Sequence, residues 1–292
     1  MASMRDIKRR KNSIQSTQQI TKAMKLVSTV KLQRAKSAAE RSKIYFNSMF
    51  ATVSSILGKS ENIEHPYLTN SGSTKKAVIA VTSNRGLAGG YNSNITKLVT
   101  NDDKFSKEDT VIYAIGKKGK DTLARKGYTI TADYNEVINA PLYADAIEIC
   151  NTVLDAYKAG EIGEIYLAYT VFKNTVSQVP TMLKLLPVDM DAAKNVMDID
   201  EEKSSAKAIM NFEPNEEDAL DLIIPKYVTS LIYGAMIEAV ASENGARMQA
   251  MDNATSNAEE MIQDLELGYN RARQAHITQE LTEIIGGAEA LS

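Results

Sequence analysis

The chain has 292 residues, of which 43% are hydrophobic and 24% are charged, with a formal net charge of −3 at pH 7. This length and balance predict one globular domain joined to a helical extension. The single cysteine, Cys150, excludes an internal disulfide bond and suits a reducing compartment.

The first 57 residues contain neither proline nor glycine, and they predict one long helix over residues 1–57. Apolar residues recur along this helix, and small residues follow where a second backbone could approach closely. These positions are Ile7, Ile14, Ile20, Met24 and Val27, then Ala35, Ala38 and Ala39. Because so long a helix needs a partner, we expect this face to pair with another helix.

Basic residues crowd the start of this helix, where the helix dipole disfavours positive charge. Lys8, Arg9 and Arg10 lie there, with Asp6 as the nearby acid. The cluster predicts contact with an acidic partner, and a solvated polar face is the alternative. Nucleic acid is disfavoured because no aromatic residue precedes Tyr45 to stack on bases. A transit peptide is also disfavoured, since the helical pattern continues without a break.

The middle of the chain changes from a linker to alternating strands and helices. Polar residues, glycine and proline fill residues 58–73, where His65 has no second ligand at metal spacing and reads as a loop histidine. Strands are predicted at 76–83, 110–116, 128–131, 164–172 and 179–188, and helices at 93–100, 117–127 and 141–159. This order predicts an open α/β, Rossmann-like sheet, mostly parallel with one antiparallel edge pair. Residues 189–214 are acidic and loop-like.

Three glycines, Gly86, Gly89 and Gly90, follow the first predicted strand. A strand, a glycine loop and a helix start could bind phosphate on backbone N–H groups. However, the spacing matches neither the dinucleotide-binding nor the P-loop motif, and no histidine, cysteine or carboxylate pair is nearby. We therefore favour a tight turn here, and we predict no catalytic site, no cofactor and no metal. Cys150 lies among apolar helix positions and is expected in the core.

Residues 215–292 predict a second long helix, with no proline between Lys226 and Ile285. Its apolar series is Leu220, Ile224, Tyr227, Leu231, Ala235, Ala241, Met248, Ile262 and Tyr269. Residues 1–43 carry twelve Lys/Arg and two Asp/Glu, whereas residues 215–292 carry four and fourteen. The opposite charges favour pairing, and the intervening domain makes it antiparallel. The apolar run 222–241 contains Pro225, Lys226 and Glu238, which indicates a buried helix rather than a membrane span.

The closing sequence ITQELTEIIGGAEA, from Ile277 to Ala290, resembles the signature of the gamma subunit of the rotary F-type ATP synthase. The segments IQSTQQITKAMKLVSTVKLQRAK and RGLAGGYN resemble the same family at corresponding places. The resemblance covers essentially the whole chain and begins within a few residues of Met1. It therefore implies a bacterial protein without a signal or transit peptide, on the cytoplasmic face of the cell membrane.

The resemblance implies a non-catalytic rotor shaft, present as one copy per complex. In the family, the coiled coil fills a ring of three alpha and three beta subunits, and the globular part rests with the epsilon subunit on a membrane ring of c subunits. Met24, Arg247, Gln274 and Thr278 stand where the family's ring-contacting and coupling residues stand. From charge alone, Lys8, Arg9 and Arg10 are expected to face an acidic loop of the beta subunits.

Three parts are therefore expected: a coiled-coil helix at 1–57, an inserted α/β domain with its flanking loops at 58–214, and a coiled-coil helix at 215–292. Two other functions stay open from the residues themselves. A phosphate-binding α/β protein would bind nucleotide as an isolated chain, whereas a shaft should not. A coiled-coil scaffold unrelated to the synthase would lack the closing block.

Overall fold

The computed structural model describes residues 4–57, 65–69, 72–188 and 216–289. These form two compact units, one of residues 1–28 with 248–292 and the other of residues 29–247. Helix α1 (Met4–Leu57) and helix α7 (Glu216–Glu289) each contribute to both units. The loop predicted at 189–214 lies outside the described residues.

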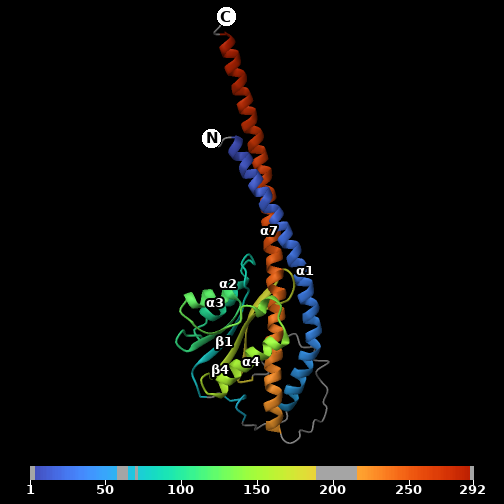
Figure 1. Ribbon diagram of the computed structural model, residues 1–292, viewed down its shortest axis with the longest axis vertical. Helices are drawn as coiled ribbons and strands as arrows, with labels where there is room; N and C mark the ends of the chain where they lie inside the picture. Colours follow the sequence, from blue (N-terminus) through green and yellow to red (C-terminus); the bar gives the residue numbers. More distant parts are fainter. Residues whose placement is uncertain (1–3, 58–64, 70–71, 189–215, 290–292) are drawn as a thin grey trace. The chain divides into compact units, whose positions relative to one another are not determined.

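The larger unit is built on a five-stranded sheet in the order β3-β2-β1-β4-β5 (Figure 1). The strands are β1 (Lys76–Val81), β2 (Thr110–Ile115), β3 (Thr129–Asp133), β4 (Glu164–Phe172) and β5 (Gln178–Leu186). Strands β1 to β4 are paired in parallel, and β5 runs antiparallel to β4 at the edge. The predicted sheet is therefore confirmed, including its antiparallel edge.

Strand β1 is buried on both faces because helices cover the sheet from both sides. Val78 and Ala80 pack with residues of α2 (Tyr91–Thr100) and α3 (Lys117–Arg125). Ala77, Ile79 and Val81 pack instead with α4 (Tyr143–Lys158), the later part of α1 and the first part of α7. The period of two between these sets reflects the alternation of side chains along a strand.

The apolar start of α7 forms much of the second core, together with the end of α1. Tyr227 stacks with Phe46 at 6.3 Å between ring centroids, and Leu231 and Ile232 are buried beside them. By length and composition, the stretch Asp218–Ala288 includes a window able to cross a membrane, but 61% of that window is buried within the protein. The run therefore behaves as the core helix expected from its charges.

In the smaller unit, α1 and α7 form an antiparallel coiled coil. The hydroxyl groups of Thr21 and Thr255 lie 2.7 Å apart, and the Lys25 ammonium lies 2.5 Å from the Asp252 carboxylate. Nearer the chain ends, Lys11 pairs with Glu266 at 2.7 Å. As α1 advances, its partners step back along α7, which confirms the predicted direction of pairing.

The predicted contact face of α1 is wrong at two positions. Ile20 and Val27 are 60% and 57% exposed, whereas Thr21 and Ser28, one residue later in each case, are buried. The reason is that the contact face alternates steps of three and four through Ile7, Lys11, Ile14, Gln18, Thr21, Lys25 and Ser28. Polar residues hold several of these positions, so a search for apolar residues alone selects the neighbouring face.

Candidate partner-contact surface

The start of α3 is hydrogen-bonded to the residues that directly follow β1, beside the glycine loop. At the start of α3, the Lys117 N–H donates to Asn84 Oδ1 at 2.9 Å, and the Gly119 N–H donates to Thr82 Oγ1 at 2.9 Å. The Lys118 N–H donates to the Ser83 carbonyl at 3.0 Å. A Cβ atom on Gly119 would lie 2.6 Å from Thr82 Oγ1, so glycine is required there by close packing. At the glycine loop itself, Gly89 has a φ of +55°, and the N–H groups of Tyr91 and Asn94 donate to the Ala88 and Gly90 carbonyls at 3.2 and 2.9 Å, which supports the reading of the loop as a tight turn.

Within the same unit, the glycine loop is fastened to α7 by Arg247. The Arg247 guanidinium donates to the Gly86 carbonyl at 3.2 Å and to the Arg85 carbonyl at 3.5 Å. It also pairs with Glu243, one turn earlier in α7, at 2.6 Å. Arg247 is only 9% exposed, so its charge is used inside the chain. A contact between Arg247 and a partner carboxylate therefore has to compete with this pair.

Met24 lies in the coiled coil of the smaller unit, where it is partly buried. Its carbonyl accepts a hydrogen bond from the Ser28 hydroxyl at 2.8 Å, one turn further along α1. Met24 directly precedes Lys25 of the contact face, so it lies at the edge of that face. The flexible thioether side chain can thus fill the seam and still reach its edge.

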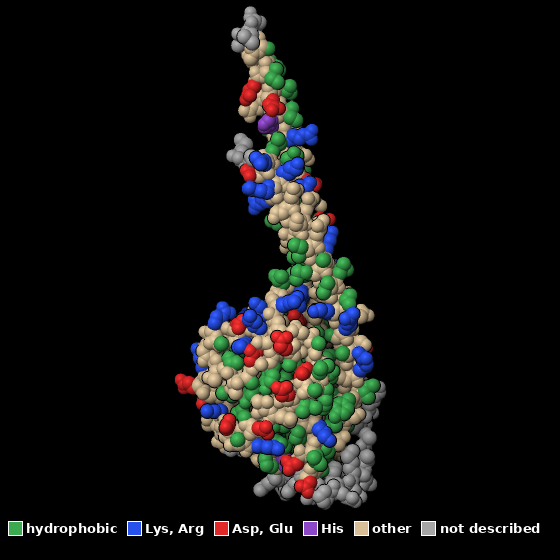
Figure 2. Space-filling view, in the orientation of Figure 1, with side chains coloured by type: hydrophobic (Ala, Val, Ile, Leu, Met, Phe, Trp, Pro, Cys, Tyr) green, Lys and Arg blue, Asp and Glu red, His purple; other side chains and the backbone are tan. Residues whose placement is uncertain are grey.

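The basic cluster at the start of α1 is exposed. Lys8, Arg9 and Arg10 all have exposed side chains, and Figure 2 shows Lys and Arg gathering around this end of the helix. Arg9 pairs with Asp6 at 3.1 Å, with side-chain exposures of 83% and 53%. A pair this exposed contributes at most about 1 kcal/mol, so it leaves the cluster available to a partner.

The end of α7 extends beyond the pairing region of α1. The register of the three cross-helix contacts brings Met4 opposite about residue 273 of α7. From residue 273 to residue 288, every described side chain is exposed. The apolar members recur at steps of four and three: Ile277, Leu281 and Ile284, with Ile285 adjacent. An apolar stripe on an unpaired helix indicates a surface that a partner covers.

Gln274 and Thr278 lie on this unpaired segment, one turn apart. The Thr278 hydroxyl donates to the Gln274 carbonyl at 2.9 Å, and both side chains are exposed. The two residues share one face, as their spacing predicts. His276 lies between them and faces Glu280 at 3.4 Å, with exposures of 55% and 60%. It is therefore a surface residue, as expected.

His65 and Cys150, for which the sequence predicts no functional role, have different surroundings. His65 is 3% exposed: its Nδ1 accepts from the Tyr67 N–H at 3.2 Å, and its Nε2 lies 3.4 Å from the Asp221 carboxylate. It is thus a packed residue rather than an ordinary loop histidine. Cys150 is buried as expected, and burial raises the pKa of its thiol to about 11 despite the opposing Thr229 hydroxyl. Across the described ranges, no three His, Cys, Asp or Glu side chains gather as metal ligands.

Sequence reasoning missed the polar contacts that fix the register of the coiled coil. Thr21 with Thr255, and Lys25 with Asp252, are the pairs concerned. Counting steps of three and four without regard to polarity would have found them, since both lie on the repeating face. Glu243 was also missed, although its spacing of four from Arg247 is a recognised signal for a helical ion pair.

This architecture defines a class: an antiparallel coiled coil with an α/β domain inserted in the sequence between its helices, ending in an unpaired apolar helix. The family model described as ATP synthase matches residues 3–291. An ATP synthase gamma chain of Lachnoclostridium phytofermentans is 67% identical over 292 residues, covering 100% of both chains. The chain belongs to the ATP synthase gamma chain family.

A second relative, the sodium ion specific ATP synthase gamma chain of Acetobacterium woodii, is 42% identical over 99% of both chains. Among solved structures, a chain of the Euglena gracilis mitochondrial ATP synthase is similar with a TM-score of 0.68 and 19% identity, over 99% of this chain and 94% of that one. A chain of the Tetrahymena thermophila enzyme has a TM-score of 0.58 and 24% identity, over 80% and 99%. The resemblance read from the closing block is therefore confirmed, and with it the central-shaft function.

Proposed function

We propose that this chain couples rotation of a membrane c-ring to the catalytic cycle of a surrounding ring of three alpha and three beta subunits. The observation that carries the proposal is the end of α7, where residues 273–288 are exposed on every side and carry an apolar stripe. A lone helix of this length is marginal in water, so its place is inside a partner. A ring of subunits around the helix provides that enclosure.

The chain works through its contacts rather than through chemistry of its own. A ring subunit opens or closes only by as much as its contact free energy with the shaft differs between the two states. The shaft has one copy per complex, so each beta subunit meets a different face at a given moment. The chain is therefore a non-catalytic subunit of the enzyme.

The proposed partners follow from the assemblies in which the solved relatives were determined. One of these assemblies is a central stalk with its c-ring, and the other contains F1 and the c-ring. For this chain, the coiled coil faces the alpha and beta subunits, and the inserted domain rests with an epsilon subunit on the c-ring. The complex then lies on the cytoplasmic face of the membrane, with the chain held there peripherally.

The proposed ring contacts come from exposed and from internally paired residues. Gln274 and Thr278 present neutral donors and acceptors from one helix face. Lys8, Arg9 and Arg10 present positive charge to an acidic loop. Arg247 acts by exchange: a ring carboxylate displaces Glu243 at one angular position and releases the guanidinium at the next. Met24 contributes a flexible side chain at the edge of the coiled-coil contact face, and this side chain can adapt its shape to a ring subunit.

The test is the mass and activity of the complex that co-purifies with the tagged chain. We expect three alpha, three beta and one gamma subunit, with ATP hydrolysis in the complex and none by the isolated chain. Nucleotide titration of the isolated chain is the matched control, and we expect no saturable binding. Turnover by the isolated chain, or a complex without alpha and beta subunits, would contradict the proposal.

A further inference from the structure

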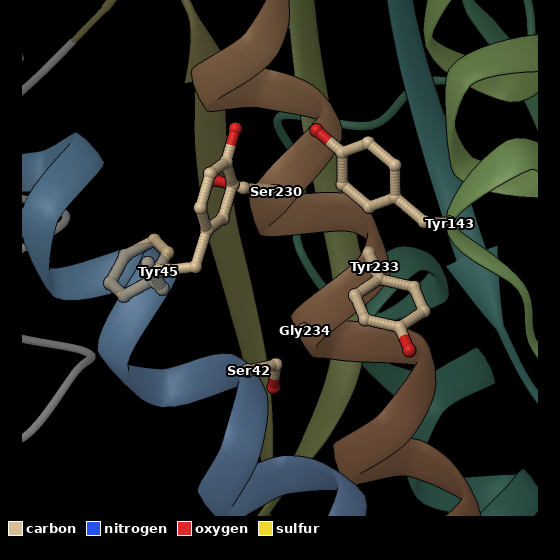
Figure 3. Close-up of a pocket in the computed structure, with 7 residues that line it drawn as sticks. Ser42, Tyr45, Tyr143, Ser230, Tyr233 and Gly234 are labelled. Carbon is tan, nitrogen blue, oxygen red and sulfur yellow. The ribbon is translucent and has the colours of Figure 1, made fainter.

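The larger unit contains a cavity that the shaft function does not use. Its volume is about 360 Å³, and it lies between the later part of α1, the start of α4 and the first part of α7 (Figure 3). The residues that line it are Ser42, Tyr45, Phe46, Tyr143, Ser230, Tyr233 and Gly234. Cavities of about 300 to 1,000 Å³ with apolar and aromatic walls are the usual form of small-molecule sites.

The walls of this cavity are aromatic rings set nearly at right angles. Tyr45 and Tyr143 have ring centroids 6.3 Å apart and an interplanar angle of 86°, and Tyr143 and Tyr233 are 5.6 Å apart at 78°. Figure 3 shows the three rings coming from three different helices around the cavity. A planar ring lying against these rings, in the space that they line, would add further stacked or edge-to-face contacts.

The polar groups of the cavity are mainly the tyrosine hydroxyls. The Ser230 hydroxyl already donates to the Tyr227 carbonyl at 2.7 Å, and the Ser42 hydroxyl donates to the Ala39 carbonyl at 3.0 Å. In Figure 3 the hydroxyls of Tyr45 and Tyr143 point toward the same end of the cavity. None of the described residues that line the cavity carries a formal charge. A complementary molecule is therefore neutral, apolar in its middle, and polar at one end.

Gly234 keeps the space open on the side of α7. A Cβ atom added there meets nothing within 4 Å, although glycine in a helix interior is less favourable than alanine. The position therefore accepts a larger side chain without a clash at its first atom. That property makes it the natural position from which to fill the cavity.

We infer that this cavity, the tyrosine pocket, binds a small neutral aromatic molecule of one or two fused rings with a single hydroxyl or comparable hydrogen-bonding group. The rings of Tyr45, Tyr143 and Tyr233 hold its flat body. The hydroxyls at one end of the pocket exchange hydrogen bonds with its polar group. This binding site is separate from the surface that contacts the alpha and beta subunits.

The test uses 2-naphthol as the probe. Its fluorescence is measured during titration with the full chain and, separately, with the assembled complex. We expect saturable binding to both. Decahydro-2-naphthol, which has the same hydroxyl on a saturated frame, should bind at least about fivefold more weakly because it lacks the flat π-system. Tetramethylammonium should not compete. Tighter binding of tetramethylammonium would overturn the assignment in favour of a cation cage.

Variants then place the probe in the pocket. Gly234→Leu should weaken 2-naphthol binding about tenfold or more by filling the space. Gly268→Leu is the matched control, because Gly268 lies in the same helix with nothing within 4 Å of an added Cβ, and binding should be unchanged. Tyr143→Phe should weaken 2-naphthol about threefold and leave naphthalene unaffected, as expected for one lost hydrogen bond.

Two results would overturn the proposal. One is unchanged 2-naphthol binding by a Gly234→Leu chain whose circular dichroism and thermal midpoint match those of the wild type. The other is binding to the isolated chain that disappears in the assembled complex, since that would make the pocket a contact for another subunit. If Gly234→Leu fails to fold, the paired response of 2-naphthol and naphthalene to Tyr143→Phe decides the question.

Discussion

At the scale of single residues, a buried ion pair joins α7 to the glycine loop. Arg247 joins Glu243 to the carbonyl groups of the glycine loop, with side-chain exposures of 10% and 13% for the ion pair. A charge in such surroundings is stable because its partners are already in place. Removing one residue of the ion pair should therefore lower the stability of the chain more than removing both.

The first prediction concerns this pair. Arg247→Ala leaves the Glu243 carboxylate and two carbonyls without their donor, and should lower the free energy of unfolding by about 2–4 kcal/mol. Urea denaturation of the isolated chain measures it. The double variant Arg247→Met with Glu243→Leu is the control and should lose less than Arg247→Ala alone. Equal losses in the two chains would contradict the pairing.

A second prediction at this scale concerns the hydroxyl layer of the coiled coil. Thr21→Val removes one of two hydroxyls that lie 2.7 Å apart and are both buried. Because the Thr255 hydroxyl then loses a partner, the unfolding free energy of the coiled coil should fall by about 1 kcal/mol. Thr21→Val combined with Thr255→Val should recover that loss. Thermal melting followed by circular dichroism gives the comparison, and additive losses would refute the layer.

At the scale of elements, the β4 and β5 strands are joined by a partly buried ion pair. Glu164 and Lys184 lie 2.8 Å apart with side-chain exposures of 20% and 28%. Burial alone would raise the pKa of Glu164, but the hydrogen bond and charge of Lys184, with the Tyr166 hydroxyl, outweigh it and lower the pKa below its usual range. A lowered carboxyl pKa links folding to pH.

The third prediction follows from the sign of this shift. The contribution of Glu164 to stability is present above the unfolded pKa of about 4.3 and is lost as pH falls through the lower folded value. Glu164→Gln should therefore destabilise the chain by about 1 kcal/mol at pH 7, and the difference should shrink below about pH 4.5. Urea unfolding across pH checks it. Glu148→Gln, an exposed control, should show no such trend.

The helices and strands were the part of the fold that the local sequence pattern predicted best. The run at β1 is buried along most of its length, and a short apolar run bounded by turns is typical of a strand in a parallel sheet. The α1 contact face was harder, because Thr21 and Ser28 are polar residues at seam positions. The surroundings of His65 were also beyond local pattern, since its Nε2 faces Asp221 of α7, which is far away in sequence.

The partner-contact residues differ in how much of their surroundings the sequence alone can predict, and this difference has a physical reason. The stripe on α7 was not predicted, although Ile277, Leu281 and Ile284 repeat at steps of four and three; its exposure is known only from the structure. The engagement of Arg247 with the glycine loop depends on tertiary packing, which no local signal contains. Roles for Met24, Gln274 and Thr278 came from resemblance, and they stay predictions.

At the scale of the whole molecule, the fourth prediction concerns the exposed cations of α1. Charge reversal of Lys8, Arg9 and Arg10 to glutamate should reduce coupling between hydrolysis and ion pumping several-fold, with chain stability nearly unchanged because the side chains are exposed. Pumping per ATP in membrane vesicles is the measurement. Substitution of the three residues by glutamine controls for loss of charge alone. Unchanged coupling would remove these residues from the contact surface.

The fifth prediction concerns the apolar tip. Truncation after Glu283, which removes Ile284 and Ile285 of the stripe, should weaken assembly with alpha and beta subunits more than it slows turnover of complexes that do assemble, because apolar contacts are non-directional and can slip during rotation. Yield of intact complex and ATP turnover per complex are the two readouts. Chains ending at residue 289 serve as the control. Full assembly with abolished turnover would contradict this account.

The exposed end of α7 has a consequence for how cells handle surplus copies. Sixteen residues of α7 are exposed in the part of the chain that the structure describes, and a helical segment with so few buried contacts opens locally at low cost, which gives proteases access to it. Once the ring closes around this segment, cleavage sites disappear. Degradation would then remove orphan shafts selectively, matching their number to that of their rings without any dedicated regulator.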